Sequence, residues 1–134
     1  MILNDKIEYE IELYEDSDGH SDIDDFLNNL ATKALKSKDA RIQFRQVSLY
    51  IELLAKNGST LSEDIMKHIE DEIWELRPGK NRVLYFFYRK NKYILLHHFI
   101  KKTQKTPRRE IEKAKKEMKD YIEREDKNEN LESI

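Results

Sequence analysis

The residues best suited to chemistry lie within positions 75–107, where basic side chains flank two strand-like apolar runs. Arg77 and Arg82 precede the first run, and Lys101 and Lys102 follow the second. A guanidinium group stays charged and can bind two phosphate oxygens at once, and an ammonium group adds a compact positive charge. This pattern indicates a site for a phosphate-rich polyanion, with RNA or DNA as the leading candidate.

The charge distribution supports this interpretation, because a nearly neutral chain contains a strongly cationic segment. The 134 residues include 25 Lys or Arg and 27 Asp or Glu, for a net charge of -2. Residues 77–119 carry 15 basic and 3 acidic side chains, whereas residues 1–76 carry 8 basic and 18 acidic ones. Some of these cations could only balance the acidic N-terminal half. A cluster at the ends of adjacent strands is harder to explain by solubility alone.

Cations beside a carboxylate fit the cleavage of RNA by its own 2′-hydroxyl. That reaction needs a base for the hydroxyl, cations for the dianionic phosphorane and an acid for the leaving 5′ oxygen. Glu75 and Arg77 share one face of an extended strand, and Arg82 begins the next strand, so the three side chains are expected to meet. Three further cations follow and could bind the RNA backbone: Lys105, Arg108 and Arg109.

Two adjacent histidines, His97 and His98, lie in the second apolar run. Neighbouring residues of a strand point to opposite faces, so these two cannot bind one metal ion together, and no metal site is predicted. One of them is expected in the core or at an interface. The other could lie in the site, with His97 as the candidate acid. The chain has no Cys, which excludes disulfides and thiolate metal sites.

Four segments precede the cationic segment. Residues 6–14 alternate strictly between apolar and charged side chains, which is typical of a half-buried strand. Apolar residues then recur at helical spacing from Ser21, a suitable N-cap, to Ala34, and a second amphipathic helix is expected over 39–56. Residues 60–71 fit either a short helix or an irregular approach to the sheet.

The cationic segment itself is expected to form strands. The pattern predicts three of them, joined by short turns: 73–77, 82–89 and 92–101. Connections this short imply an antiparallel three-stranded meander. Thr106 and Pro107 are typical of an N-cap followed by a proline in the first helical turn, so a last helix is expected over 107–125.

This order of elements predicts an α+β domain over residues 1–125, with its helices gathered on one side of the sheet. The acidic tail, 126–134, is expected to fray. The longest apolar run, 83–88, is too short to cross a bilayer, and the N-terminus lacks the apolar core of a signal peptide. We therefore expect a cytoplasmic protein without membrane contacts.

Three strings in the sequence resemble a known family: ELR, the strand that begins Arg-Val-Leu-Tyr, and LLHHFIKKTQKTP leading into EIEKAKKEM. Together they resemble phage-derived RelE-like toxins, especially the HigB toxins of type II toxin–antitoxin systems, over roughly 70–120. The resemblance implies a RelE-like fold and a cytoplasmic endoribonuclease, an mRNA interferase that cuts mRNA at the ribosome and inhibits translation. It implies no metal or other cofactor. It also implies a HigA-like helix-turn-helix antitoxin, a toxin–antitoxin heterotetramer and a monomeric free toxin.

The resemblance also implies roles for individual residues. Arg82 matches the phosphate-binding arginine of the family, and Arg77 matches the arginine of its ELR motif. Lys101 and Lys102 match the basic pair after the last strand, which stabilises charge or supplies the leaving-group proton. Glu75 stands where RelE itself has a catalytic lysine, which makes this carboxylate a candidate general base.

Two alternatives stay open at this point. A ParE-like toxin of the same superfamily would inhibit gyrase by binding, without RNA chemistry. The ELR motif and the lysine pair argue against it, because a protein that only binds does not need them. A non-catalytic RNA-binding module would instead bind RNA with strong salt dependence and leave it uncut.

Overall fold

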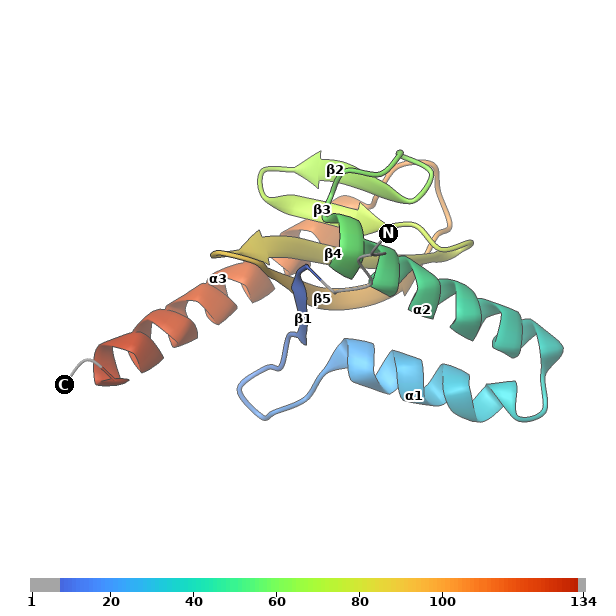
Figure 1. The fold of residues 1–134 in the computed structure, drawn as a ribbon, viewed down its shortest axis with the longest axis horizontal. Coiled ribbons are helices and arrows are strands. Elements are labelled where there is room, and N and C mark those ends of the chain that lie inside the picture. Colours follow the sequence, from blue (N-terminus) through green and yellow to red (C-terminus); the bar gives the residue numbers. More distant parts are fainter. Residues whose placement is uncertain (1–7, 133–134) are drawn as a thin grey trace, which may run out of the picture.

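The structure is a computed structural model that describes residues 8–132, which form one sheet and three helices (Figure 1). The elements in chain order are β1 (Glu10–Leu13), α1 (Asp22–Ala34), α2 (Lys38–Asn57), β2 (Met66–Glu70), β3 (Ile73–Leu76), β4 (Asn81–Tyr88), β5 (Lys92–Ile100) and α3 (Arg108–Glu132). This is the mixed α+β class that the sequence predicts.

The sheet has five strands in the order β1-β5-β4-β3-β2, so it differs from the predicted three-stranded meander. Strands β2 to β5 pair antiparallel with their neighbours, and β1 pairs parallel with β5. The extra strand β2 lies in the segment 60–71, for which a short helix or an irregular approach was predicted. A bulge between His68 and Glu70 breaks the two-residue period there, so Met66 and Ile69 do not show the spacing of a strand.

The N-terminal strand is shorter than predicted. The sequence indicates a strand over 6–14, whereas β1 covers Glu10–Leu13, and residues 6 and 7 lie outside the described part of the chain. Its position at the edge of the sheet is set by parallel pairing with β5, in which Ile11 lies opposite Tyr93. Lys92 of β5 also forms an ion pair with Glu12, at 3.1 Å.

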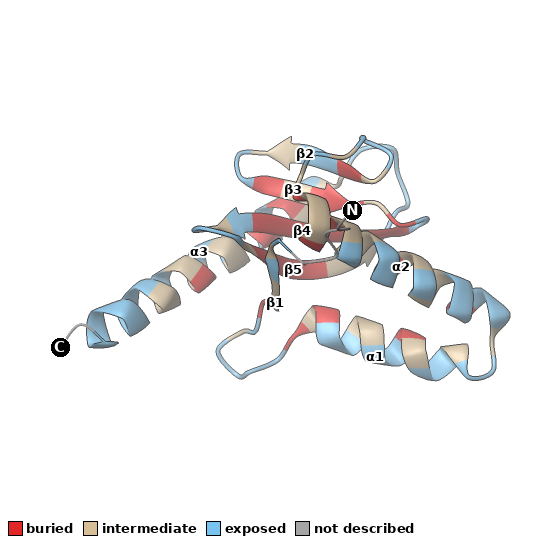
Figure 2. Ribbon diagram, in the orientation of Figure 1, coloured by how far each residue is buried: buried red, intermediate tan, exposed pale blue. Residues whose placement is uncertain are grey.

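The helices cover both faces of the sheet, which corrects the prediction that they gather on one side (Figure 1). Leu84 of β4 packs in one core cluster with Ala114 of α3. The next two residues of β4 alternate: Tyr85 packs with Ile23 of α1 on the opposite face, and Phe86 returns to the α3 side. A strand buried on both faces has no polar side, which explains the unbroken apolar run of β4 (Figure 2).

The starts of α1 and α2 follow their capping residues. The Ser21 hydroxyl accepts a hydrogen bond from the Asp24 amide at 3.1 Å, so the predicted N-cap is confirmed. Ser37 does the same for the amide of Ala40 at the start of α2. Each hydroxyl satisfies an amide that has no partner within its helix.

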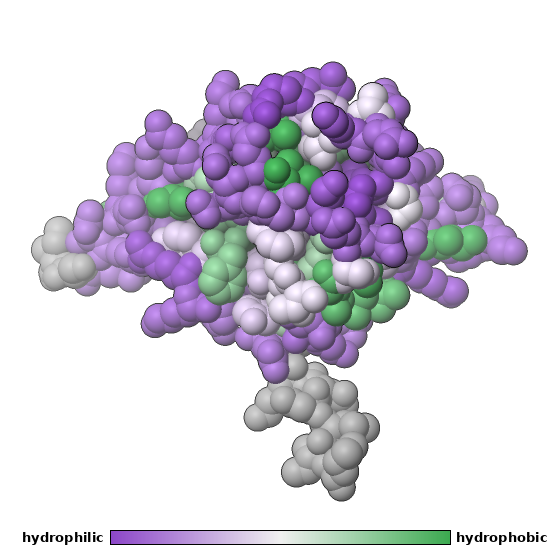
Figure 3. Space-filling view, turned by 90° about the horizontal axis from the view of Figure 1, so that it is seen from above, coloured by the Kyte–Doolittle hydropathy of each residue, from purple (hydrophilic) through white to green (hydrophobic). Residues whose placement is uncertain are grey.

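The last helix is longer than the predicted 107–125. α3 runs to Glu132 and includes most of the segment for which fraying was predicted. Arg89, in the turn after β4, binds Asp126 at 2.9 Å and also pairs with Glu129. The face shown in Figure 3 has a hydrophilic rim and separate apolar patches. Within residues 8–132, no helix combines the length and apolar character needed to cross a bilayer.

Candidate functional site

A small hollow at one end of the sheet contains five of the predicted site residues. It lies between the ends of β3, β4 and β5 and the loop 101–107 that leads into α3. We call it the Glu75 pocket. The predicted residues that line it are Glu75, Arg82, Lys101, Lys102 and Lys105, together with Phe99 and Thr106. Its volume is about 10 Å³, close to the space that one water molecule needs.

Glu75 is the centre of this pocket. The residue is 2% exposed, and its Oε2 lies 3.5 Å from Arg77 Nε and 3.9 Å from Arg82 Nε. Its other oxygen, Oε1, accepts a hydrogen bond from the Thr106 hydroxyl at 2.8 Å. The three charged side chains meet, as strand geometry predicts. Two guanidinium groups compensate the cost of burying one carboxylate.

Arg82 is held in a fixed orientation by the backbone. It is 6% exposed, and its Nη1 donates to the carbonyls of Gly79 at 2.7 Å and Asn81 at 2.8 Å. Burial lowers the pKa of Arg82, and the charge of Glu75 opposes that shift. Within residues 8–132, Arg82 Nη2 makes no hydrogen bond. This nitrogen therefore stays available for an anion.

Arg77 is half-buried and links the end of β3 to the loop that precedes β2. Its Nη1 donates to the carbonyl of Glu63 at 2.9 Å. Its Nε is buried and has no hydrogen-bond partner in the described part of the chain. This Nε lies within ion-pair distance of Glu75 Oε2, and Arg77 itself is not among the residues that line the Glu75 pocket.

The loop lysines differ from the arginines because they are exposed. Lys101, Lys102 and Lys105 have no carboxylate partner among residues 8–132. Three ammonium groups therefore surround the entrance to the pocket. Its floor is Glu75, whose negative charge is compensated by Arg77 and Arg82. Such an arrangement attracts an anion.

The two predicted backbone-binding arginines of α3 lie elsewhere. Arg108 binds Glu70 of β2 at 2.8 Å and Glu112 at 3.1 Å. Hydrogen bonds from Arg108 and Lys115 lower the pKa of Glu70 to about 2. Arg109 is exposed, with its Nε 3.6 Å from Glu110. Neither arginine lines the Glu75 pocket, and Arg108 is occupied by a structural ion pair.

His97, predicted as a candidate acid, is a core residue. It is fully buried between the sheet and α3, with Nδ1 2.5 Å from Glu117 and Nε2 3.0 Å from Glu110. Both ring nitrogens are thus occupied, and the ring does not line the Glu75 pocket. Leu84 pairs with His97 and Tyr85 with Leu95, so the strand contains a bulge that turns His97 toward α3.

His98 points to the opposite face, as predicted for adjacent strand residues. Its ring stacks on Phe26 of α1, with the ring centroids 3.6 Å apart, and its Nε2 lies 3.0 Å from the Asn81 side-chain oxygen. Burial is the main cause that lowers its pKa to about 4, although the charge of Asp22 opposes the shift. His98 is therefore neutral at physiological pH.

We expect His98 to make folding sensitive to mild acid. The unfolded chain binds a proton with a pKa near 6.5, whereas folded His98 does so only near 4, so stability falls as pH drops through this window. Between pH 7 and pH 5 the loss should be about 2 kcal/mol. Urea unfolding at both pH values measures this loss of stability. The His98→Gln protein should lose about 2 kcal/mol less than the wild type over this interval, and equal losses would contradict the assignment.

The sequence did not reveal the role of Thr106. It was predicted as an N-cap, but α3 begins at Arg108, and the Thr106 hydroxyl binds Glu75. The loop is also held by the Lys101 amide, which donates to the Lys80 carbonyl at 2.8 Å. These two contacts keep loop 101–107 closed over the Glu75 pocket. No sequence pattern signals a contact between residues 31 positions apart.

Replacing Thr106 by valine should loosen this loop. The change preserves side-chain shape and removes the hydroxyl, and a hydrogen bond to a charged group contributes about 1.5–3 kcal/mol. We expect the Lys101 amide to exchange its hydrogen at least ten-fold faster in NMR hydrogen exchange. Thr106→Ser, which retains the hydroxyl, is the matched control and should exchange like the wild type. Equal protection in Thr106→Val would show that the contact does not hold the loop.

Comparison with known proteins gives one family. The model of the family described as "Phage derived protein Gp49-like (DUF891)" matches residues 33–119, which is more than half of the chain. The match includes all residues that line the Glu75 pocket. No curated protein was found to match the chain.

Proposed function

Because this chain belongs to the Gp49-like family of phage-derived proteins, within the RelE/ParE-like toxin superfamily, we propose that it is a HigB-like endoribonuclease toxin that cleaves mRNA. RelE-like proteins include ribonuclease toxins, and membership in a toxin–antitoxin family implies an antitoxin partner. The observation that carries the proposal is the buried Glu75 carboxylate, which faces two guanidinium groups beneath three unpaired lysines.

These side chains supply the three groups that transesterification needs. Glu75 takes the proton of the 2′-hydroxyl, and the 2′ oxygen attacks the adjacent phosphorus. Arg82, through its unoccupied Nη2, and Arg77 stabilise the dianionic phosphorane. Lys102 gives a proton to the departing 5′ oxygen as the P–O5′ bond breaks. The products are a 2′,3′-cyclic phosphate and a 5′-hydroxyl end, and no metal ion takes part in these steps.

The loop 101–107 must move before RNA can reach Glu75, because a pocket of about 10 Å³ does not admit a phosphate group. Loss of the Thr106 hydrogen bond frees Glu75 Oε1 to act as the base. In the open state Lys101 and Lys105 bind backbone phosphates beside the scissile one. This loop is the part of the site that RNA binding reorganises.

The proposed cellular role follows that of HigB toxins. The protein acts in the cytoplasm on mRNA at the ribosome and inhibits translation. A HigA-like helix-turn-helix antitoxin neutralises it in a heterotetramer, and the free toxin is a monomer.

Mapping of RNA ends tests the proposal. Purified protein is added to a translating extract with a defined mRNA, and 5′ ends are mapped by primer extension. Cleavage should give new ends that carry a 5′-hydroxyl and upstream fragments that end in a cyclic phosphate. Intact transcripts together with gyrase inhibition would contradict the proposal and support a ParE-like binding toxin. Bound but intact RNA would support a non-catalytic RNA-binding module.

A further inference from the structure

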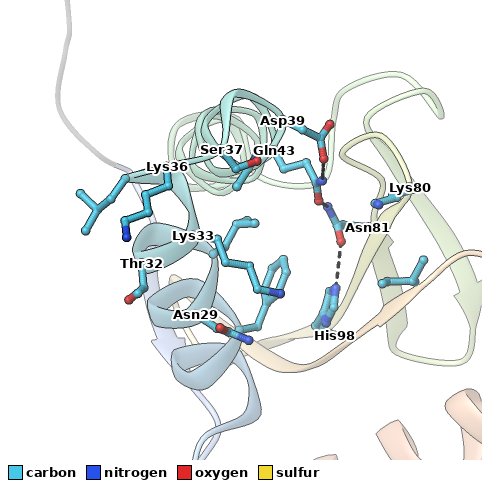
Figure 4. Close-up of a pocket in the computed structure, with 15 residues that line it drawn as sticks. Asn29, Thr32, Lys33, Lys36, Ser37, Asp39, Gln43, Lys80, Asn81 and His98 are labelled. Carbon is cyan, nitrogen blue, oxygen red and sulfur yellow. Dashed lines mark hydrogen bonds between the residues drawn. The ribbon is translucent and has the colours of Figure 1, made fainter.

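A second and larger cavity lies at the same end of the sheet but on its other face (Figure 4). It is bounded by α1, α2 and the ends of β4 and β5, and we call it the α1–α2 cavity. Its volume is about 810 Å³, within the range of pockets that bind small molecules and large enough for a nucleotide. None of the predicted site residues lines it.

The walls of the α1–α2 cavity are largely apolar and partly exposed. Phe26 and Leu30 of α1 form one side. Leu35, just after α1, is 81% exposed, and Ile100 at the end of β5 is 46% exposed. Large apolar side chains grouped in an open hollow mark binding sites more often than isolated ones do. A planar, apolar group of a ligand would find a matching surface here.

Three lysines surround these walls. Lys33 comes from the end of α1, Lys36 from the turn after it, and Lys80 from the turn before β4. None of the three has a carboxylate partner among residues 8–132. Figure 4 shows the Lys33 side chain extending into the cavity and Lys80 on the far side. The only acidic residue among those that line the cavity is Asp39, so the lining carries net positive charge.

A fixed chain of polar side chains forms the far wall. The Gln43 amide donates to Asp39 at 2.7 Å, and the Asn81 amide donates to the Gln43 side-chain oxygen at 3.1 Å. The Asn81 oxygen therefore accepts from His98 Nε2. In contrast, the side-chain amide of Asn29 makes no hydrogen bond within the described residues. It offers a free donor and a free acceptor, the two groups that a base edge requires.

The α1–α2 cavity and the Glu75 pocket share one edge. The consecutive residues Asn81 and Arg82 face opposite sides of the sheet, Asn81 toward the cavity and Arg82 toward the pocket. At this edge the Lys101 amide binds the Lys80 carbonyl, so a lysine of the cavity lies beside a lysine of the pocket. A single strand that crosses the edge would contact both sites.

We infer that the α1–α2 cavity binds one base of single-stranded RNA, a few nucleotides from the scissile phosphate, while Lys33, Lys36 and Lys80 bind the adjoining phosphates. This inference rests on the proposed function, since it names a second contact of the same RNA. RNA-binding proteins hold unpaired bases by stacking on aromatic rings, here Phe26 and His98, and by hydrogen bonds to the base edges. The shared Lys80–Lys101 edge favours RNA over an acidic protein segment, which would need no access to the Glu75 pocket.

Abasic substitution tests this inference. A fluorescently labelled, 2′-O-methylated RNA, which cannot be cleaved, is titrated with the full protein, and each nucleotide in turn is replaced by an abasic one. We expect one position at which loss of the base weakens binding at least five-fold, because stacking of a base contributes about 1–3 kcal/mol, a factor of about 5 to 150. In the Leu35→Glu protein this position should lose its effect. Leu35 is exposed, so the substitution should not disturb folding.

Two double variants that remove the same charge separate binding in the cavity from non-specific electrostatic attraction to RNA. Lys33→Gln/Lys36→Gln should weaken binding of the intact RNA about ten-fold at low salt and reduce its salt dependence. Lys116→Gln/Lys119→Gln removes the same charge at the same spacing from the exposed face of α3 and should have a much smaller effect.

Four outcomes would overturn the inference. Equal affinity for all abasic RNAs, or equal loss in both lysine pairs, would exclude a base-binding cavity, while mRNA cleavage by the wild type would leave the proposed function intact. Binding of a synthetic Glu/Leu amphipathic helix that Leu35→Glu abolishes, without any abasic effect, would assign the cavity to a protein partner. Failure of the wild type both to bind RNA and to cleave mRNA in a translating extract would remove the inference and the proposed function together.

Discussion

Replacement of Arg82 by alanine is expected to lower the rate of mRNA cleavage by about 10²–10³-fold, since one donor to a transition-state oxyanion contributes about 2.7–4 kcal/mol. Arg82 is the guanidinium group best prepared for this role. Two backbone carbonyls fix its Nη1, and its Nη2 has no partner within residues 8–132. Single-turnover cleavage in a translating extract measures the rate, and growth after induction reports toxicity.

Two further variants are needed to interpret this result. Arg82→Lys retains the charge but cannot bind two phosphate oxygens, so we expect an intermediate rate. Arg89→Ala removes an exposed arginine after the same strand, one that pairs with Asp126 and Glu129, and should leave the rate unchanged. Because Arg82 is buried, thermal unfolding of each variant must accompany the kinetics. A folded Arg82→Ala protein as toxic as the wild type would contradict the proposed function.

The meeting of Glu75, Arg77 and Arg82 could be predicted because it depends only on local rules. Alternation along β3 places Glu75 and Arg77 on one face, and a short turn brings Arg82 back beside them. The N-cap at Ser21 is an equally local feature. Each of these features can be predicted from fewer than ten neighbouring residues.

The errors arise where a local rule is broken or where distant segments meet. A bulge hides β2, and a second bulge places His97 on the α3 face, where Glu110 and Glu117 occupy both of its ring nitrogens. The placement of α3 opposite α1 and α2 depends on β4, whose unbroken apolar run is typical of a strand covered on both faces. The α1–α2 cavity joins α1 to Asn81 and His98, residues that no sequence spacing connects.

Substitution of Glu75 by glutamine is expected to lower the cleavage rate by about 10²–10⁴-fold, the usual contribution of a general base. The amide oxygen of the substituted side chain can still accept the Thr106 hydroxyl, so loop 101–107 should stay in place. Glutamine cannot take a proton from the 2′-hydroxyl at neutral pH. The same single-turnover assay measures the effect.

Glu75 also compensates the buried guanidinium group of Arg82 and the half-buried one of Arg77, so a structural and a catalytic role must be separated. Glu75→Ala leaves Arg77 and Arg82 without this carboxylate and should reduce the free energy of unfolding by about 3–5 kcal/mol. The control Glu110→Gln alters another half-buried carboxylate, which binds His97 outside the Glu75 pocket. It should change stability and leave the rate unchanged. A Glu75→Gln protein that cleaves at the wild-type rate would make Glu75 a counter-ion alone, and the base would then have to come from the loop lysines.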